Sequence, residues 1–92
     1  DIEFSLMLHL RRNVVNTLCY IYAGMWLIPY IDLAIYCPQA NFKDWLTILD
    51  IIDESDTLLK IDCIRLDGLD DSAPIKNSIT NKGIKIYDRK QN

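Results

Sequence analysis

The sequence predicts an α+β fold in which a helical N-terminal half packs on a small antiparallel sheet. Three observations predict it: a helical apolar period near the N-terminus, a capped amphipathic segment in the middle, and a turn between short alternating runs near the C-terminus. We expect helices at about 2–26, 29–37 and 42–53, and strands at about 58–66, 78–80 and 84–88. With 92 residues, the chain is expected to form a single domain over 1–92.

The first helix is predicted from two stripes of side chains. The apolar stripe steps by three or four residues through Phe4, Met7, Leu10, Val14, Leu18, Ile21 and Met25. A polar stripe follows another face through Ser5, His9, Arg12 and Asn16. The run FSLMLHL also alternates as a strand does, but the polar stripe favours a helix.

The next two predicted helices are indicated by a proline and by a capping residue. Pro29 suits the first position of a helix, which favours a short helix at 29–37. Alternating apolar residues in this segment also fit a buried strand. Asn41 precedes the third helix as a polar cap. The apolar residues of that helix keep the helical spacing and are Trp45, Ile48, Leu49 and Ile52.

A membrane segment is an alternative interpretation of 13–31. The run between Arg12 and Asp32 has no charge and approaches the roughly 20 residues that span a bilayer. Asn13, Asn16 and Pro29 within it favour a buried core helix instead.

The C-terminal third is predicted to hold the sheet. The segment 58–66 is rich in apolar and β-branched residues and ends at the turn pair Asp67-Gly68. Asn81-Lys82-Gly83 is expected to connect 78–80 with 84–88 as a hairpin.

Charge is segregated along the chain. The net charge is −3, but residues 41–75 carry three cations against nine acids, whereas 76–92 carry five cations against Asp88. A segment this acidic repels phosphate backbones, so no nucleic-acid binding is expected over it. The short basic tail, in contrast, carries the charge that binding to nucleic acid requires.

The sequence lacks the residue patterns that several binding and catalytic sites require. Three glycines cannot build a phosphate-binding loop, and one histidine with three separated cysteines offers no zinc spacing or disulfide framework. The best hydrolase arrangement would join Asp67, Asp70 and Asp71 to Asp88, Arg89 and Lys90, but the negative field would repel a phosphate substrate. We therefore expect no enzyme, cofactor or metal site.

The acidic stretch is instead a candidate surface for a basic protein. Acids at the C-terminal end of the third helix oppose its dipole, and such a local cost is expected where a surface serves a partner. The candidate partner-binding residues are Asp50, Asp53, Glu54, Asp56, Asp62, Asp67, Asp70, Asp71 and Tyr36.

These observations favour a small acidic protein-binding module in the cytoplasm that inhibits a basic enzyme. Bacterial immunity proteins that neutralise nuclease toxins are an analogy in size, charge and missing chemistry, not in sequence. One alternative is a homo-oligomer in which 50–71 of one copy meets 76–90 of another. A membrane-tethered regulator and a merely solvated acidic surface are the others.

Overall fold

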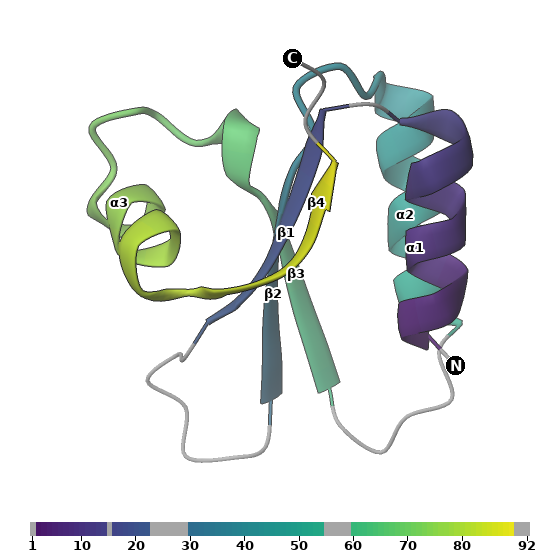
Figure 1. Cartoon of the computed structure of the whole chain (residues 1–92), viewed down its shortest axis with the longest axis horizontal. Helices are drawn as coiled ribbons and strands as arrows, with labels where there is room; N and C mark the ends of the chain where they lie inside the picture. Colours follow the sequence, from purple (N-terminus) through teal and green to yellow (C-terminus); the bar gives the residue numbers. More distant parts are fainter. Residues whose placement is uncertain (1, 15, 23–29, 55–59, 90–92) are drawn as a thin grey trace.

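The computed structural model describes residues 2–14, 16–22, 30–54 and 60–89. It contains three helices, a single 3₁₀ turn and four strands in the described part of the chain (Figure 1). In chain order these are α1 Ile2–Asn13, β1 Thr17–Tyr22, β2 Tyr30–Tyr36, α2 Phe42–Asp53, β3 Lys60–Arg65, η1 Leu66–Gly68, α3 Pro74–Lys82 and β4 Ile84–Arg89.

The strands form one mixed sheet in the order β3-β2-β1-β4. β1 pairs antiparallel with β2 and with β4, while β2 and β3 run parallel and are connected through α2. The β1–β4 register shifts between Cys19 and Tyr20, which is the mark of a bulge. The predicted all-antiparallel sheet is therefore wrong for the β2–β3 pair.

Each face of the sheet is covered by different helices (Figure 1). α1 and α2 cover one face, where the buried cluster is Leu6, Leu10, Val14, Cys19, Leu33, Ile35, Cys37, Ala40, Ile48 and Ile52. α3 and η1 cover the other face, where the buried cluster is Leu18, Tyr20, Ala34, Leu66 and Ile79. The α+β class is confirmed, but the helical N-terminal half is not, because two strands follow α1 directly.

The predicted helix at 2–26 ends at Asn13 and gives way to β1. Asn16, three residues later, has φ 55°, a left-handed conformation that is incompatible with a continuing helix and that asparagine tolerates better than most residues. The following TLCYIY is rich in aromatic and β-branched side chains, which favour a strand. Four consecutive residues of β1 are buried because the sheet is covered on both faces, so its apolar run lacks a strand period.

The predicted helix at 29–37 is also wrong, since β2 occupies Tyr30–Tyr36. Alternating residues of β2 reach the two opposite cores, with Leu33 and Ile35 on the α1–α2 side and Ala34 on the α3 side. The alternation was thus a better guide than Pro29, which lies outside the described residues.

The helix at 42–53 is confirmed with the predicted bounds. Asn41 caps it: its side chain accepts a hydrogen bond from the Asp44 backbone N–H at 2.8 Å, and the Asp44 carboxylate accepts one from the Asn41 N–H at 3.2 Å. This reciprocal capping box fixes where α2 begins.

Of the three strands predicted in the C-terminal third, two are confirmed and one is wrong. β3 and β4 correspond to 58–66 and 84–88, although 58 and 59 lie outside the described residues. The strand at 78–80 is wrong because α3 covers it, with Pro74 in the first turn where its missing N–H costs nothing. β4 therefore pairs with β1 and not with a hairpin partner.

The proposed membrane segment at 13–31 includes the end of α1, all of β1 and the start of β2. Residues 15 and 23–29 of this segment lie outside the described residues. No helix in the described ranges is long and apolar enough to cross a membrane.

Candidate functional site

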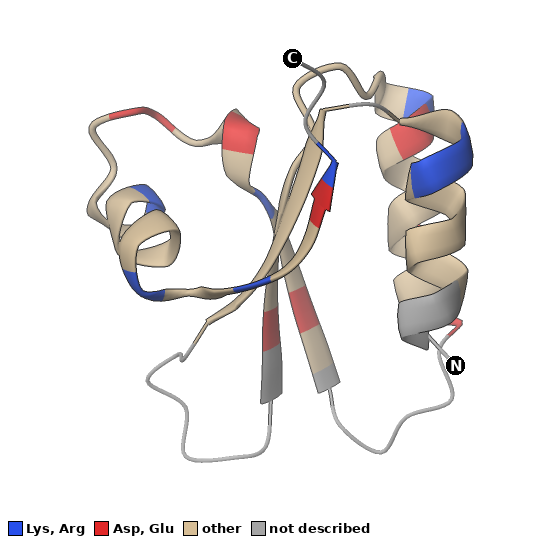
Figure 2. Cartoon of the chain, viewed as in Figure 1, with Lys and Arg blue, Asp and Glu red and all other residues tan. Residues whose placement is uncertain are grey.

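The predicted acidic residues do not form one surface. Asp50, Asp53 and Glu54 lie at the C-terminal end of α2, whereas Asp67, Asp70 and Asp71 lie on η1 and the loop before α3. These two groups occupy opposite faces of the sheet and opposite ends of the molecule (Figures 1 and 2). Asp56 lies outside the described residues.

Asp67 is committed to an internal network. One carboxylate oxygen accepts the Cys37 backbone N–H at 2.8 Å, and the other accepts Arg65 Nε at 3.0 Å. Arg65 Nη2 also donates to the carbonyls of Cys37 at 3.0 Å and Ala40 at 2.7 Å. The guanidinium lies over the Trp45 ring, 5.7 Å from its centroid. This Arg65 network joins η1 to the connection between β2 and α2.

Asp70 and Asp71 lie in the loop that leads into α3. The Asp70 carboxylate accepts hydrogen bonds from the backbone N–H and from the hydroxyl of Ser72. These two bonds, the backbone one more strongly, lower the pKa of the Asp70 carboxyl. Asp71 is 96% exposed and pairs with Lys76 at 2.6 Å. Because the Asp71 carboxylate lies almost fully in solvent, its pair with Lys76 contributes little to stability, and Asp71 remains accessible to another cation.

Asp62 belongs to a third location, on β3. It is aligned with Asp32 of β2, which is aligned in turn with Tyr22 of β1, so the three residues form one row across the sheet. Burial, followed by the charges of Asp32 and Asp62, raises the pKa of Tyr22. Asp62 is partly buried, so it is a poorer contact for a protein partner than the exposed carboxylates of α2.

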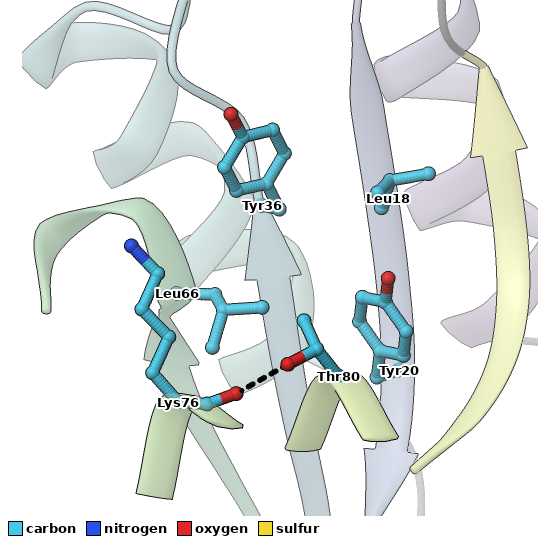
Figure 3. A pocket seen from close by; sticks show the side chains of 6 residues that line it. All are labelled: Leu18, Tyr20, Tyr36, Leu66, Lys76 and Thr80. Atoms are coloured by element: carbon cyan, nitrogen blue, oxygen red, sulfur yellow. Dashed lines mark hydrogen bonds between the residues drawn. The ribbon is translucent and has the colours of Figure 1, made fainter. Parts of the chain in front are cut away.

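Tyr36 lines an open pocket of about 190 Å³ between α3 and the sheet (Figure 3). The lining residues come from β1, β2, η1 and α3 and are Leu18, Tyr20, Tyr36, Leu66, Lys76 and Thr80. The Thr80 hydroxyl donates to the Lys76 carbonyl at 2.8 Å. This pocket lies on the same face of the sheet as Asp70 and Asp71, and away from the acids of α2.

The C-terminal acids of α2 are the least compensated of the predicted residues. Asp50, Asp53 and Glu54 are all exposed, and the last turn of α2 contains no basic residue. No ion pair to these three carboxylates occurs within the part of the chain that the structure describes. Their charge is therefore available to a partner.

Two apolar residues on the same helix were missed by the sequence argument. Phe42 is 72% exposed and Leu46 is 45% exposed. The signal was present, because the core-facing series of this helix, Trp45, Ile48 and Ile52, leaves positions 42 and 46 on another face. We call Phe42, Leu46, Asp50 and Asp53 the α2 stripe.

Within the described ranges, few side chains are placed to bind a metal ion or to act as a nucleophile. Among the described residues, no group of three or more His, Cys, Asp or Glu side chains is placed to hold a metal ion. Burial raises the pKa of Cys19, Cys37 and Cys63 to about 12, so these thiols stay protonated and poorly nucleophilic near neutral pH. His9 bonds through Nδ1 to Asn13, at 3.1 Å.

Comparison with known proteins finds no family model, curated relative or solved structure that matches this chain.

Proposed function

We propose that this chain is a small acidic protein-binding module that docks onto a basic protein and inhibits it in the cytoplasm. The observation that carries the proposal is the exposed end of α2, where Asp50, Asp53 and Glu54 meet no cation in the described structure. Carboxylates there are disfavoured by the negative end of the helix dipole, by roughly 0.3–1 kcal/mol each at low salt. Binding to a basic surface would offset that cost.

In this mechanism the carboxylates occupy the positions that substrate phosphates take on a basic enzyme such as a nuclease. Long-range attraction would accelerate association, and close pairing with Lys or Arg would slow dissociation. Blocking the cationic site requires no catalytic group on this chain.

The proposal is tested by affinity capture from the native host at low and high salt, with the recovered proteins identified by mass spectrometry. We expect a stoichiometric basic protein that is released by salt, because the screening length for exposed charges falls from about 10 Å at 0.1 M to about 3 Å at 1 M. A variant carrying Asp50→Lys, Asp53→Lys and Glu54→Lys should lose it. Asp71→Lys, on the opposite face, is the matched control and should retain it.

Capture that is unaffected by the triple reversal would contradict the proposal. Recovery of only the protein itself would also contradict it and would favour a self-associating module. Circular dichroism of both variants distinguishes lost binding from lost folding.

A further inference from the structure

The α2 stripe divides into an apolar half and an acidic half. Phe42, Leu46, Asp50 and Asp53 are separated by four, four and three residues, so they lie along one face of the helix. At about 1.5 Å per residue, this face is about 16 Å long. All four side chains are exposed, while the opposite face of α2 buries Ile48 and Ile52 against the sheet. The stripe is thus a second face of α2, not part of its core contact.

Phe42 and Leu46 expose apolar surface on the same helix face as the carboxylates of Asp50 and Asp53. Phe42 in particular leaves most of its ring in solvent. Burying aromatic area stabilises a complex, and aromatic side chains are common anchors at protein interfaces. The neighbouring carboxylates set the chemistry that the covering surface must have.

A second copy of this chain does not match the α2 stripe. Two stripes packed antiparallel would place Asp50 and Asp53 of one copy on Phe42 and Leu46 of the other, burying carboxylates against apolar groups. Two stripes packed parallel would oppose carboxylate to carboxylate. A complementary surface instead presents an apolar group beside a cluster of Lys or Arg.

We propose that the α2 stripe is the docking surface, and that it binds a helix of a basic protein with apolar and basic residues segregated along one face. This inference rests on the proposed function and specifies its site. Phe42 and Leu46 take the apolar end, while Asp50 and Asp53 take the basic end. An antiparallel approach places the positive N-terminal end of the bound helix beside the acidic end of α2.

The probe is a synthetic helical peptide with lysines on one face of its N-terminal half and leucines on the same face of its C-terminal half. A control peptide has the same composition with lysines and leucines interleaved. Titration into ¹⁵N-labelled protein, followed by amide chemical shifts, locates the contact. We expect shifts along α2 and at least about tenfold tighter binding of the segregated peptide.

Matched variants separate the two halves of the stripe. Phe42→Ala with Leu46→Ala should weaken binding of the segregated peptide about tenfold or more at both low and high salt. Asp50→Asn with Asp53→Asn, which removes the charges and keeps the side-chain shape, should remove most of the salt dependence. Ile75→Ala with Ile84→Ala is the control, because these side chains are also exposed but lie on α3 and β4.

Equal affinity for the two peptides, or shifts confined to α3 and the loop of Asp70 and Asp71, would overturn the proposed docking surface. So would a dimer, seen by sedimentation, that Phe42→Ala and Leu46→Ala dissociate. A captured basic protein that binds the Phe42→Ala, Leu46→Ala variant normally would refute this docking site alone. Peptide binding without any basic partner in the host would instead refute the proposed inhibitory function.

Discussion

Replacing Asp67 by alanine should destabilise the domain far more than its position in an acidic stretch of the sequence suggests. The substitution removes the acceptor of the Cys37 N–H, at 2.8 Å, and the charge partner of Arg65, at 3.0 Å. A hydrogen bond to a charged group contributes about 1.5–3 kcal/mol. The paired side chains are only 24% and 13% exposed, for Arg65 and Asp67 respectively, so their ion pair lies between the surface and buried extremes.

Together these contributions give an expected loss of about 2–4 kcal/mol in the free energy of unfolding for Asp67→Ala. The total free energy of unfolding of such domains is roughly 5–15 kcal/mol, so the variant would lose a large fraction of its stability. Urea unfolding followed by Trp fluorescence measures the change, with an unchanged slope showing that the unfolded state is comparable. Asp71→Ala is the control and should change the free energy by no more than about 0.5 kcal/mol.

A loss below about 1 kcal/mol for Asp67→Ala would refute the reasoning, because it would mean that water replaces the carboxylate without cost. The double variant with Arg65→Ala tests the pairing directly. Since the two residues act together, its loss should fall short of the sum of the single losses. If the losses add, the Arg65 network does not couple these two side chains.

Three further outcomes are expected. Asn41→Ala removes the cap on the Asp44 N–H and should cost about 1 kcal/mol of unfolding free energy, measured in urea. Gly83→Ala would place a Cβ 2.5 Å from the Ile79 carbonyl oxygen, so the backbone must shift. Overpacking of this kind costs about 1–3 kcal/mol of unfolding free energy, and the melting temperature should fall accordingly. Because burial raises the three cysteine pKa values from 9.0 to about 12, only the unfolded state ionises its thiols between those values; urea midpoints should therefore fall as pH rises above about 9.

The parts of the fold that were predictable are those where local signals agree. In α2 the cap, the helical period and the first-turn acid all indicate the same start, and the predicted bounds 42–53 are confirmed. In 2–26 the apolar period passes smoothly from α1 into β1, because a strand buried on both faces has no alternation to distinguish it. Asn16, in its left-handed conformation, lies between the two elements, but an asparagine in the sequence does not by itself indicate that conformation.

The candidate site was predictable in its charge but not in its geometry. Sequence order placed Asp50 and Asp67 in one acidic stretch, yet β3 runs the length of the sheet between them and carries the chain to the other end (Figure 2). The internal use of Asp67 depends on Arg65 and on the Cys37 backbone, which are brought together only by the parallel pairing of β2 and β3. No local pattern indicates such a contact.

The pairing of β4 with β1 has a consequence for how the protein is made. β1 is synthesised early, but its outer edge is covered only by β4, the last described element to leave the ribosome. Until then one edge of β1 has no strand beside it, and an open edge of this kind recruits other strands. A chaperone that shields residues 17–22 should therefore raise the yield of folded protein more than one that acts after release.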